Sequence, residues 1–133
     1  MKNFLPYKQS IELKQLGFDE PCIGSFTNID RPCFFRHKKP KTYSKLFQPK
    51  TDHCVSPLYQ EVFEWFRAEK NLFAEIFIDD DKTYGYLISY FVEQGRADKP
   101  IKRQFKTYNE AQLACIDVMI YSIKTTTLTV KTI

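Results

Sequence analysis

Residues 56–70, SPLYQEVFEWFRAEK, predict one amphipathic helix around which the rest of the fold is organised. Ser56 is a suitable N-cap, and Pro57 suits the first helical position, where its missing N–H donor costs nothing. With about 100° of rotation per residue, the apolar side chains share one arc and the polar side chains the opposite arc. The apolar arc holds Leu58, Tyr59, Val62, Phe63, Trp65 and Phe66. Because burying each large apolar side chain contributes about 1.5–3 kcal/mol, we expect this helix to anchor the core.

Two segments after this helix, residues 72–78 and 83–92, are rich in aromatic and β-branched residues and flank an acidic turn over 79–82. Such a pattern predicts an antiparallel hairpin. Its second strand has an aromatic face formed by Tyr84, Tyr86 and Tyr90. A polar connection over 93–100 then leads to a possible third strand at 101–105.

Thr107 and Glu110 have the spacing of a capping box just before an apolar run. They predict a second main helix that extends to about Ile123. The tail, residues 125–133, is rich in Thr and Val, and it fits an edge strand, a strand added to a partner's sheet, or a frayed terminus.

The N-terminal part of the chain predicts smaller elements. Residues 8–16 fit a short helix that ends at Gly17, and residues 21–26 and 32–36 fit a hairpin. From His37 to Val55, proline breaks and the lack of periodicity predict a long surface loop.

Together these elements predict an α+β fold, a small antiparallel sheet packed against two main helices. The size of 133 residues favours a single domain over 1–133. Within it we expect an N-terminal helix, hairpin and basic loop at 8–55, an α-β-β-β-α core at 56–124, and the tail. The core has the element order of the double-stranded RNA-binding domain. That resemblance is topological, because Glu110 stands where that family has a phosphate-binding, lysine-rich helix start.

The net charge of +4 is unevenly distributed along the chain. Residues 31–50 hold seven basic and no acidic residues, whereas the rest holds 13 basic and 16 acidic residues. A concentrated charge of this kind bears on partners rather than on fold. No apolar run reaches the roughly 20 residues of a membrane span, and the N-terminus lacks the apolar core of a signal peptide, so we expect a cytoplasmic protein with no membrane association.

Residue types that carry catalysis or bind metals form no convincing pattern. Cys33, His37, His53 and Cys54 are zinc-ligand types, but the last two are adjacent, which makes convergence on one ion unfavourable. The acidic turn lacks the glycine and the distal glutamate of a calcium loop. The sequence has no nucleophile elbow and no glycine-rich phosphate loop, and its four cysteines fit free, mostly buried thiols. We therefore expect no enzyme activity, no cofactor and no metal.

The sequence feature that still bears on function is a mixture of basic and aromatic side chains between residues 31 and 50. Basic groups neutralise phosphates, and aromatic rings stack on bases or pack beneath a loop. A second basic stretch runs from Arg96 to Lys106. The binding residues predicted from these two stretches are Arg36, Lys38, Lys39, Lys41, Tyr43, Lys45 and Arg103.

Three blocks of sequence resemble a family of small proteins from phages, prophages and mobile elements of Bacteroides-type gut bacteria. The blocks are 16–22 (LGFDEPC), 57–67 (PLYQEVFEWFR) and 107–115 (TYNEAQLAC). The resemblance spans roughly residues 11–124. It implies a phage or mobile-element origin and carries over no activity.

The sequence thus favours a non-enzymatic accessory protein of phage or mobile-element type, located in the cytoplasm of the bacterial host cell. We expect it to bind nucleic acid, a small nucleotide or an acidic host protein through the 31–50 segment. The alternative is an interaction protein that forms a homo-oligomer through its aromatic strand face or its C-terminal tail.

Overall fold

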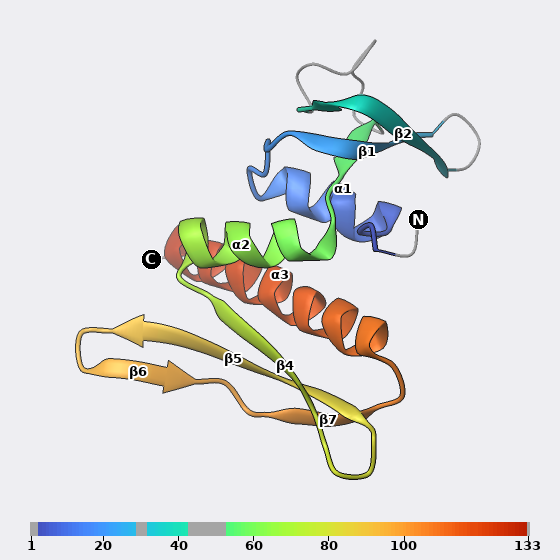
Figure 1. The fold of residues 1–133 in the computed structure, drawn as a ribbon. Coiled ribbons are helices and arrows are strands. Elements are labelled where there is room, and N and C mark those ends of the chain that lie inside the picture. The colour runs from blue at the N-terminus through green and yellow to red at the C-terminus, as the bar shows by residue number, and fades with distance from the viewer. Residues whose placement is uncertain (1–2, 29–31, 43–52, 133) are drawn as a thin grey trace. The chain divides into compact units, whose positions relative to one another are not determined.

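The computed structural model describes residues 3–28, 32–42 and 53–132 (Figure 1). The elements within these ranges are α1 Tyr7–Gln15, β1 Cys22–Asn28, β2 Pro32–Lys41, β3 Cys54–Ser56, α2 Tyr59–Lys70, β4 Phe73–Ile78, β5 Tyr84–Val92, β6 Gly95–Asp98, β7 Lys102–Phe105 and α3 Tyr108–Thr132. Helices and two antiparallel sheets confirm the predicted α+β class. None of the described helices is long and apolar enough to cross a membrane.

The chain divides into two compact units, residues 1–61 and 62–133, and each is described by itself. The single-domain organisation stays a prediction.

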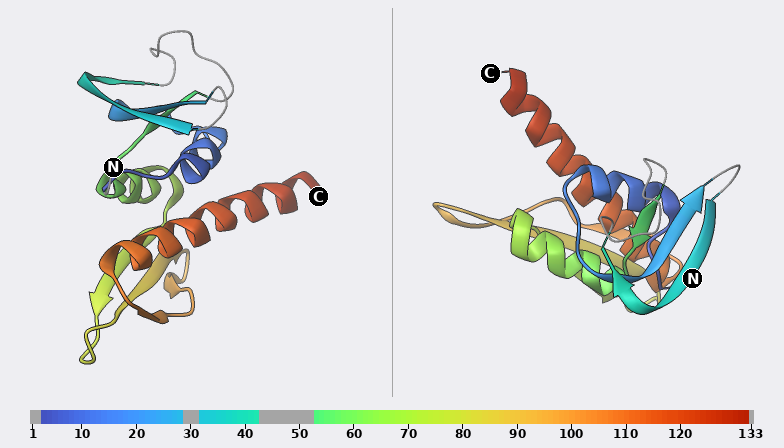
Figure 2. Two further views of the ribbon diagram at one scale, coloured as in Figure 1. Left: turned by 90° about the vertical axis from the view of Figure 1, so that its right-hand side faces the viewer. Right: turned by 90° about the horizontal axis from the view of Figure 1, so that it is seen from above.

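The sheet of the first unit has the strand order β2-β1-β3, with β1 antiparallel to both neighbours. Figure 2 shows β1 and β2 lying side by side. The predicted N-terminal hairpin is therefore confirmed. The predicted loop over 37–55 is wrong at both ends, because β2 continues to Lys41 and β3 begins at Cys54. The middle of that predicted loop, residues 43–52, lies outside the described residues.

One face of this sheet forms the core of the first unit. Phe26 lies at the centre, with its ring centroid 5.6 Å from Tyr7 and 5.5 Å from Phe34. The Phe34 ring in turn lies 5.0 Å from Phe4. Helix α1 ends as predicted at Gly17, whose φ of 101° lets the Phe18 N–H reach the Leu13 carbonyl at 3.2 Å. These contacts fix β1 and its partners against the N-terminal segment.

Helix α2 begins at Tyr59, two residues later than the cap pattern predicts. Ser56 belongs to β3, is fully buried, and donates its hydroxyl to the Leu5 carbonyl at 2.7 Å. The carboxylate of Glu61 instead accepts the Leu58 N–H at 2.8 Å, as a capping side chain does. The predicted apolar arc is confirmed, since Tyr59, Val62, Trp65 and Phe66 are buried.

The sheet of the second unit has the order β4-β5-β6, and β7 also pairs with β5. The predicted hairpin of β4 and β5 and the third strand, β7, are confirmed. The predicted plain connection over 93–100 is wrong, because it contains β6. Val92 pairs with Gly95, whose φ of 125° suits the turn that returns the chain along β5.

Helix α3 packs on β5 and starts at the predicted capping box. The Thr107 hydroxyl accepts the Glu110 N–H at 3.1 Å. Because α3 extends to Thr132, the predicted strand or frayed tail is wrong. The tyrosine face of β5 is also not the open surface that the sequence suggested, since Tyr86 is 4% exposed.

Gly24 offers a test of the packing in the first unit. A Cβ at this position would lie 2.8 Å from the Ser56 carbonyl oxygen and 2.9 Å from the Phe34 ring. We expect Gly24→Ala to lower the free energy of unfolding by about 1–3 kcal/mol, because a backbone atom must shift. Urea denaturation measures the change, with Thr27→Ala on the same strand as the control. Equal stability of Gly24→Ala and wild type would contradict the packing described.

Candidate nucleic-acid interface

Four of the predicted binding residues lie on one edge strand. Strand β2 pairs with β1 on one side and has no other neighbour among the described strands. Arg36, Lys38 and Lys39 are exposed, and Lys41 is half-buried. The predicted loop site is therefore an ordered row of cations along the edge of a sheet.

An irregularity in the ladder displaces part of this strand from regular pairing. Gly24 pairs with Arg36 and Cys22 pairs with Lys41, so β1 advances two residues where β2 advances five. Residues 37–40 thus form a bulge. The Nε2 atom of His37 lies 2.6 Å from the Ser25 hydroxyl oxygen and ties the start of the bulge to β1. Lysines, a bulge and Pro40 on an edge strand also oppose pairing with the edge of another chain.

The cations of β2 have no carboxylate partner among the described residues. The ion pairs of Arg96 with Asp98 and of Arg103 with Asp79 belong to the second unit. The first unit as a whole holds ten basic and six acidic residues, and the second holds ten of each. The whole net charge of the chain therefore comes from the unit that contains β2.

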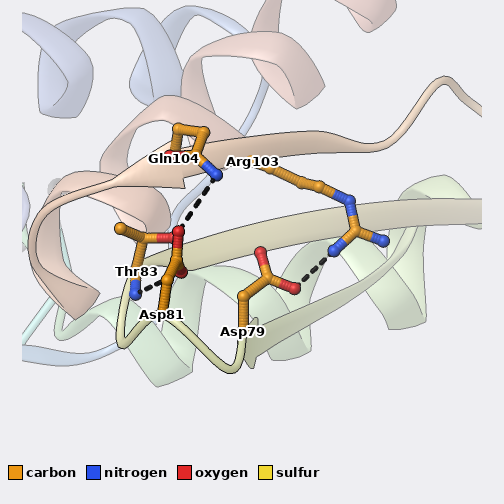
Figure 3. Close-up of polar contacts among 5 residues, drawn as sticks. All are labelled: Asp79, Asp81, Thr83, Arg103 and Gln104. Atoms are coloured by element: carbon orange, nitrogen blue, oxygen red, sulfur yellow. Dashed lines mark hydrogen bonds and ion pairs between the residues drawn. The ribbon is translucent and has the colours of Figure 1, made fainter.

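Arg103, the predicted binding residue of the second unit, is already engaged. Its guanidinium donates to Asp79 (Figure 3). The same group lies 5.1 Å from the centroid of the Phe77 ring. A Cβ at Gly85 would lie 2.5 Å from the Phe77 ring, so the absence of a side chain there makes room for that ring. Arg103 thus has a structural role. The other two predicted residues, Tyr43 and Lys45, lie outside the described residues.

The acidic turn is likewise occupied by protein contacts. Asp81 accepts the Thr83 hydroxyl at 2.6 Å and the Thr83 N–H at 3.1 Å (Figure 3). These hydrogen bonds lower the pKa of the Asp81 carboxyl, and Gln104 adds a weaker contact at 3.4 Å. Asp79 and Asp81 therefore connect the β4–β5 turn to β7.

Two further cations of the second basic stretch, Arg96 and Lys99, also have partners in the second sheet. The Arg96 Nε donates to Asp98 at 2.9 Å, and the Ser89 hydroxyl donates to the same oxygen at 2.7 Å. The hydroxyl of Ser89 and then the guanidinium of Arg96 lower the pKa of the Asp98 carboxyl. Lys99 lies over the Tyr90 ring at 5.7 Å.

Ser25 and His37 form a pair of catalytic residue types that the sequence did not single out. A serine hydroxyl next to an imidazole resembles an activated nucleophile. Ser25 is only 2% exposed, so a substrate cannot reach its hydroxyl. The pairing of β1 with β2 was the signal that could have placed these two side chains together.

The predicted zinc-ligand types do not gather into a site. No group of three or more His, Cys, Asp or Glu side chains in the described ranges is arranged to hold a metal ion. Cys33 is exposed, whereas Cys54 is buried on the opposite edge strand, β3.

Comparisons with known proteins add no relative: no family model, no curated protein and no solved structure matches the chain.

The thiols allow a test of burial in both units. Burial raises the pKa of Cys22, Cys54 and Cys115 to about 12, with the nearby Glu61 carboxylate adding to the effect at Cys22. These thiols stay protonated and unreactive at pH 8. We expect a disulfide reagent to titrate one thiol quickly in the native protein and all four in guanidinium.

Replacing Cys33 by Ser should remove the fast reaction, because Cys33 is the exposed thiol. Fast labelling of two or more thiols in native protein would contradict the burial described.

Proposed function

We propose that this protein is a non-enzymatic accessory protein of phage or mobile-element type that binds nucleic acid through strand β2. The observation that carries the proposal is the row of Arg36, Lys38, Lys39 and Lys41 on an edge strand without carboxylate partners among the described residues. Neutralising phosphates releases condensed counterions, so such a row favours a polyanion as partner. The proposed origin and the bacterial cytoplasm as location rest on the sequence blocks described above.

The second proposal is a homo-oligomer, and one observation favours it. On the second sheet, Phe91 is 51% exposed with its ring 5.3 Å from Phe73. Aromatic side chains are enriched at the centre of interfaces. Light scattering at high protein concentration tests this alternative, and a strict monomer would exclude it.

The nucleic-acid proposal is tested with two variants of equal charge change. One variant carries Arg36→Gln, Lys38→Gln, Lys39→Gln and Lys41→Gln, and its matched control carries Arg67→Gln, Lys99→Gln, Lys102→Gln and Lys106→Gln. Fluorescence anisotropy with labelled single- and double-stranded DNA and RNA over a salt series measures the affinity. We expect wild type and control to bind with strong salt dependence. The slope of log Kobs against log salt concentration should be about 3 units less steep for the β2 variant, because four cations no longer neutralise phosphates.

Equal weakening in both variants would show that only net charge matters and would contradict a β2 site. No binding by wild type at low salt would overturn the proposal and direct attention to acidic proteins. Circular dichroism and light scattering of each variant exclude misfolding or edge-to-edge aggregation as the cause of lost binding.

A further inference from the structure

Two neighbouring aromatic residues of β2, Phe34 and Phe35, have different environments. In the ladder, Phe34 lies opposite Phe26 and Phe35 lies opposite Ser25, so their side chains project from opposite faces of the sheet. The Phe34 ring packs on Phe26 and Phe4. The Phe35 ring is 50% exposed and makes no ring contact within the described part of the chain.

The exposed ring of Phe35 is next to the unpaired cations. Arg36 follows it in the chain but lies opposite Gly24 in the ladder and so projects from the other face, whereas the bulge that carries Lys38 and Lys39 begins one residue later. Phe34 anchors the strand in the core, and His37 holds the other side of Phe35 through Ser25. An exposed aromatic ring is thus fixed between two anchored neighbours beside a row of positive charge.

A nucleic-acid single strand and a duplex present different groups to such a surface. Both offer phosphates to the lysines, but duplex bases are stacked on one another, so their faces are closed to a side chain. A single strand exposes base faces, and stacking on an aromatic ring adds sequence-tolerant affinity. Only the single strand engages both the cations and the ring.

From this juxtaposition of ring and charge we infer that the ligand of β2 is single-stranded nucleic acid, with one base stacked on Phe35 and the adjacent phosphates neutralised by Lys38 and Lys39 of the bulge. This inference rests on the proposed function and narrows its substrate class. Because the stacked group is a base face, we expect little preference among sequences.

The test compares Phe35→Ala, Phe35→Leu and Phe35→Trp in the full chain, with labelled oligothymidine, oligouridine and a DNA duplex as probes. Phe35→Ala should weaken single-strand binding by roughly 5- to 150-fold, the range that corresponds to loss of one stacked base. Phe35→Leu should weaken single-strand binding similarly, because leucine is apolar but has no ring. Phe35→Trp should retain single-strand binding. The salt slope should stay unchanged because no charge is lost.

The matched control is Tyr121→Ala, which removes an exposed aromatic ring, 70% exposed, from α3 in the second unit. It should bind as wild type does. Duplex affinity should be weaker than single-strand affinity in wild type and unaffected by Phe35→Ala.

Failure of this inference is distinguishable from failure of the proposed function. Loss of binding in the four-residue β2 variant together with unchanged single-strand binding in Phe35→Ala would overturn the stacking role alone. If the wild-type protein binds the duplex as tightly as the single strand, or more tightly, the stacking role alone is likewise overturned. If the four-residue variant binds as wild type does, both proposals fall.

Discussion

Strand β2 has a hydrogen-bonded partner along one side only among the described strands, and the features of the candidate site follow from this position. An edge strand exposes side chains that an inner strand would bury, and it is tolerant of lysine, proline and bulges. The core side of the strand is held by Phe34, which packs on Phe26 and Phe4. Because side chains alternate along a strand, anchoring Phe34 directs Phe35 to the other face.

The two units use the same basic residue types in different ways. In the second unit Arg96 and Arg103 each pair with an aspartate, and basic and acidic residues are equal in number. Ion pairs of this exposure contribute little stability, but they leave no excess charge for a polyanion. In the first unit the cations of β2 lack such partners within the described ranges. The same residue type is therefore paired with a carboxylate in the second unit and has no carboxylate partner on β2 among the described residues.

Local signals predicted most of the fold, and non-local pairing explains what they missed. Four features could be predicted because they depend on residues that are close together in the sequence. They are the end of α1 at Gly17, the apolar arc of α2, the capping box of α3 and the β4–β5 hairpin. Strand β3 and the second half of β2 form because they pair with β1, which is distant in the sequence. The lysines and the proline of residues 37–41 are typical of a loop, so the sequence alone did not predict a strand there. Ser56 fitted a helix cap by pattern, but its partner is Leu5, 51 residues away. The ion pair of Arg103 with Asp79, 24 residues away, likewise could not be predicted from local spacing.

The most direct test of β2 as the binding surface is amide hydrogen exchange, measured by mass spectrometry on the full chain with and without a single-stranded oligonucleotide at low salt. Binding at the edge should slow exchange in peptides that cover residues 32–41, and leave peptides from β4 to β7 unchanged. Slowed exchange confined to residues 73–105, or none in 32–41 while the oligonucleotide is bound, would contradict the assignment of β2 as the interface.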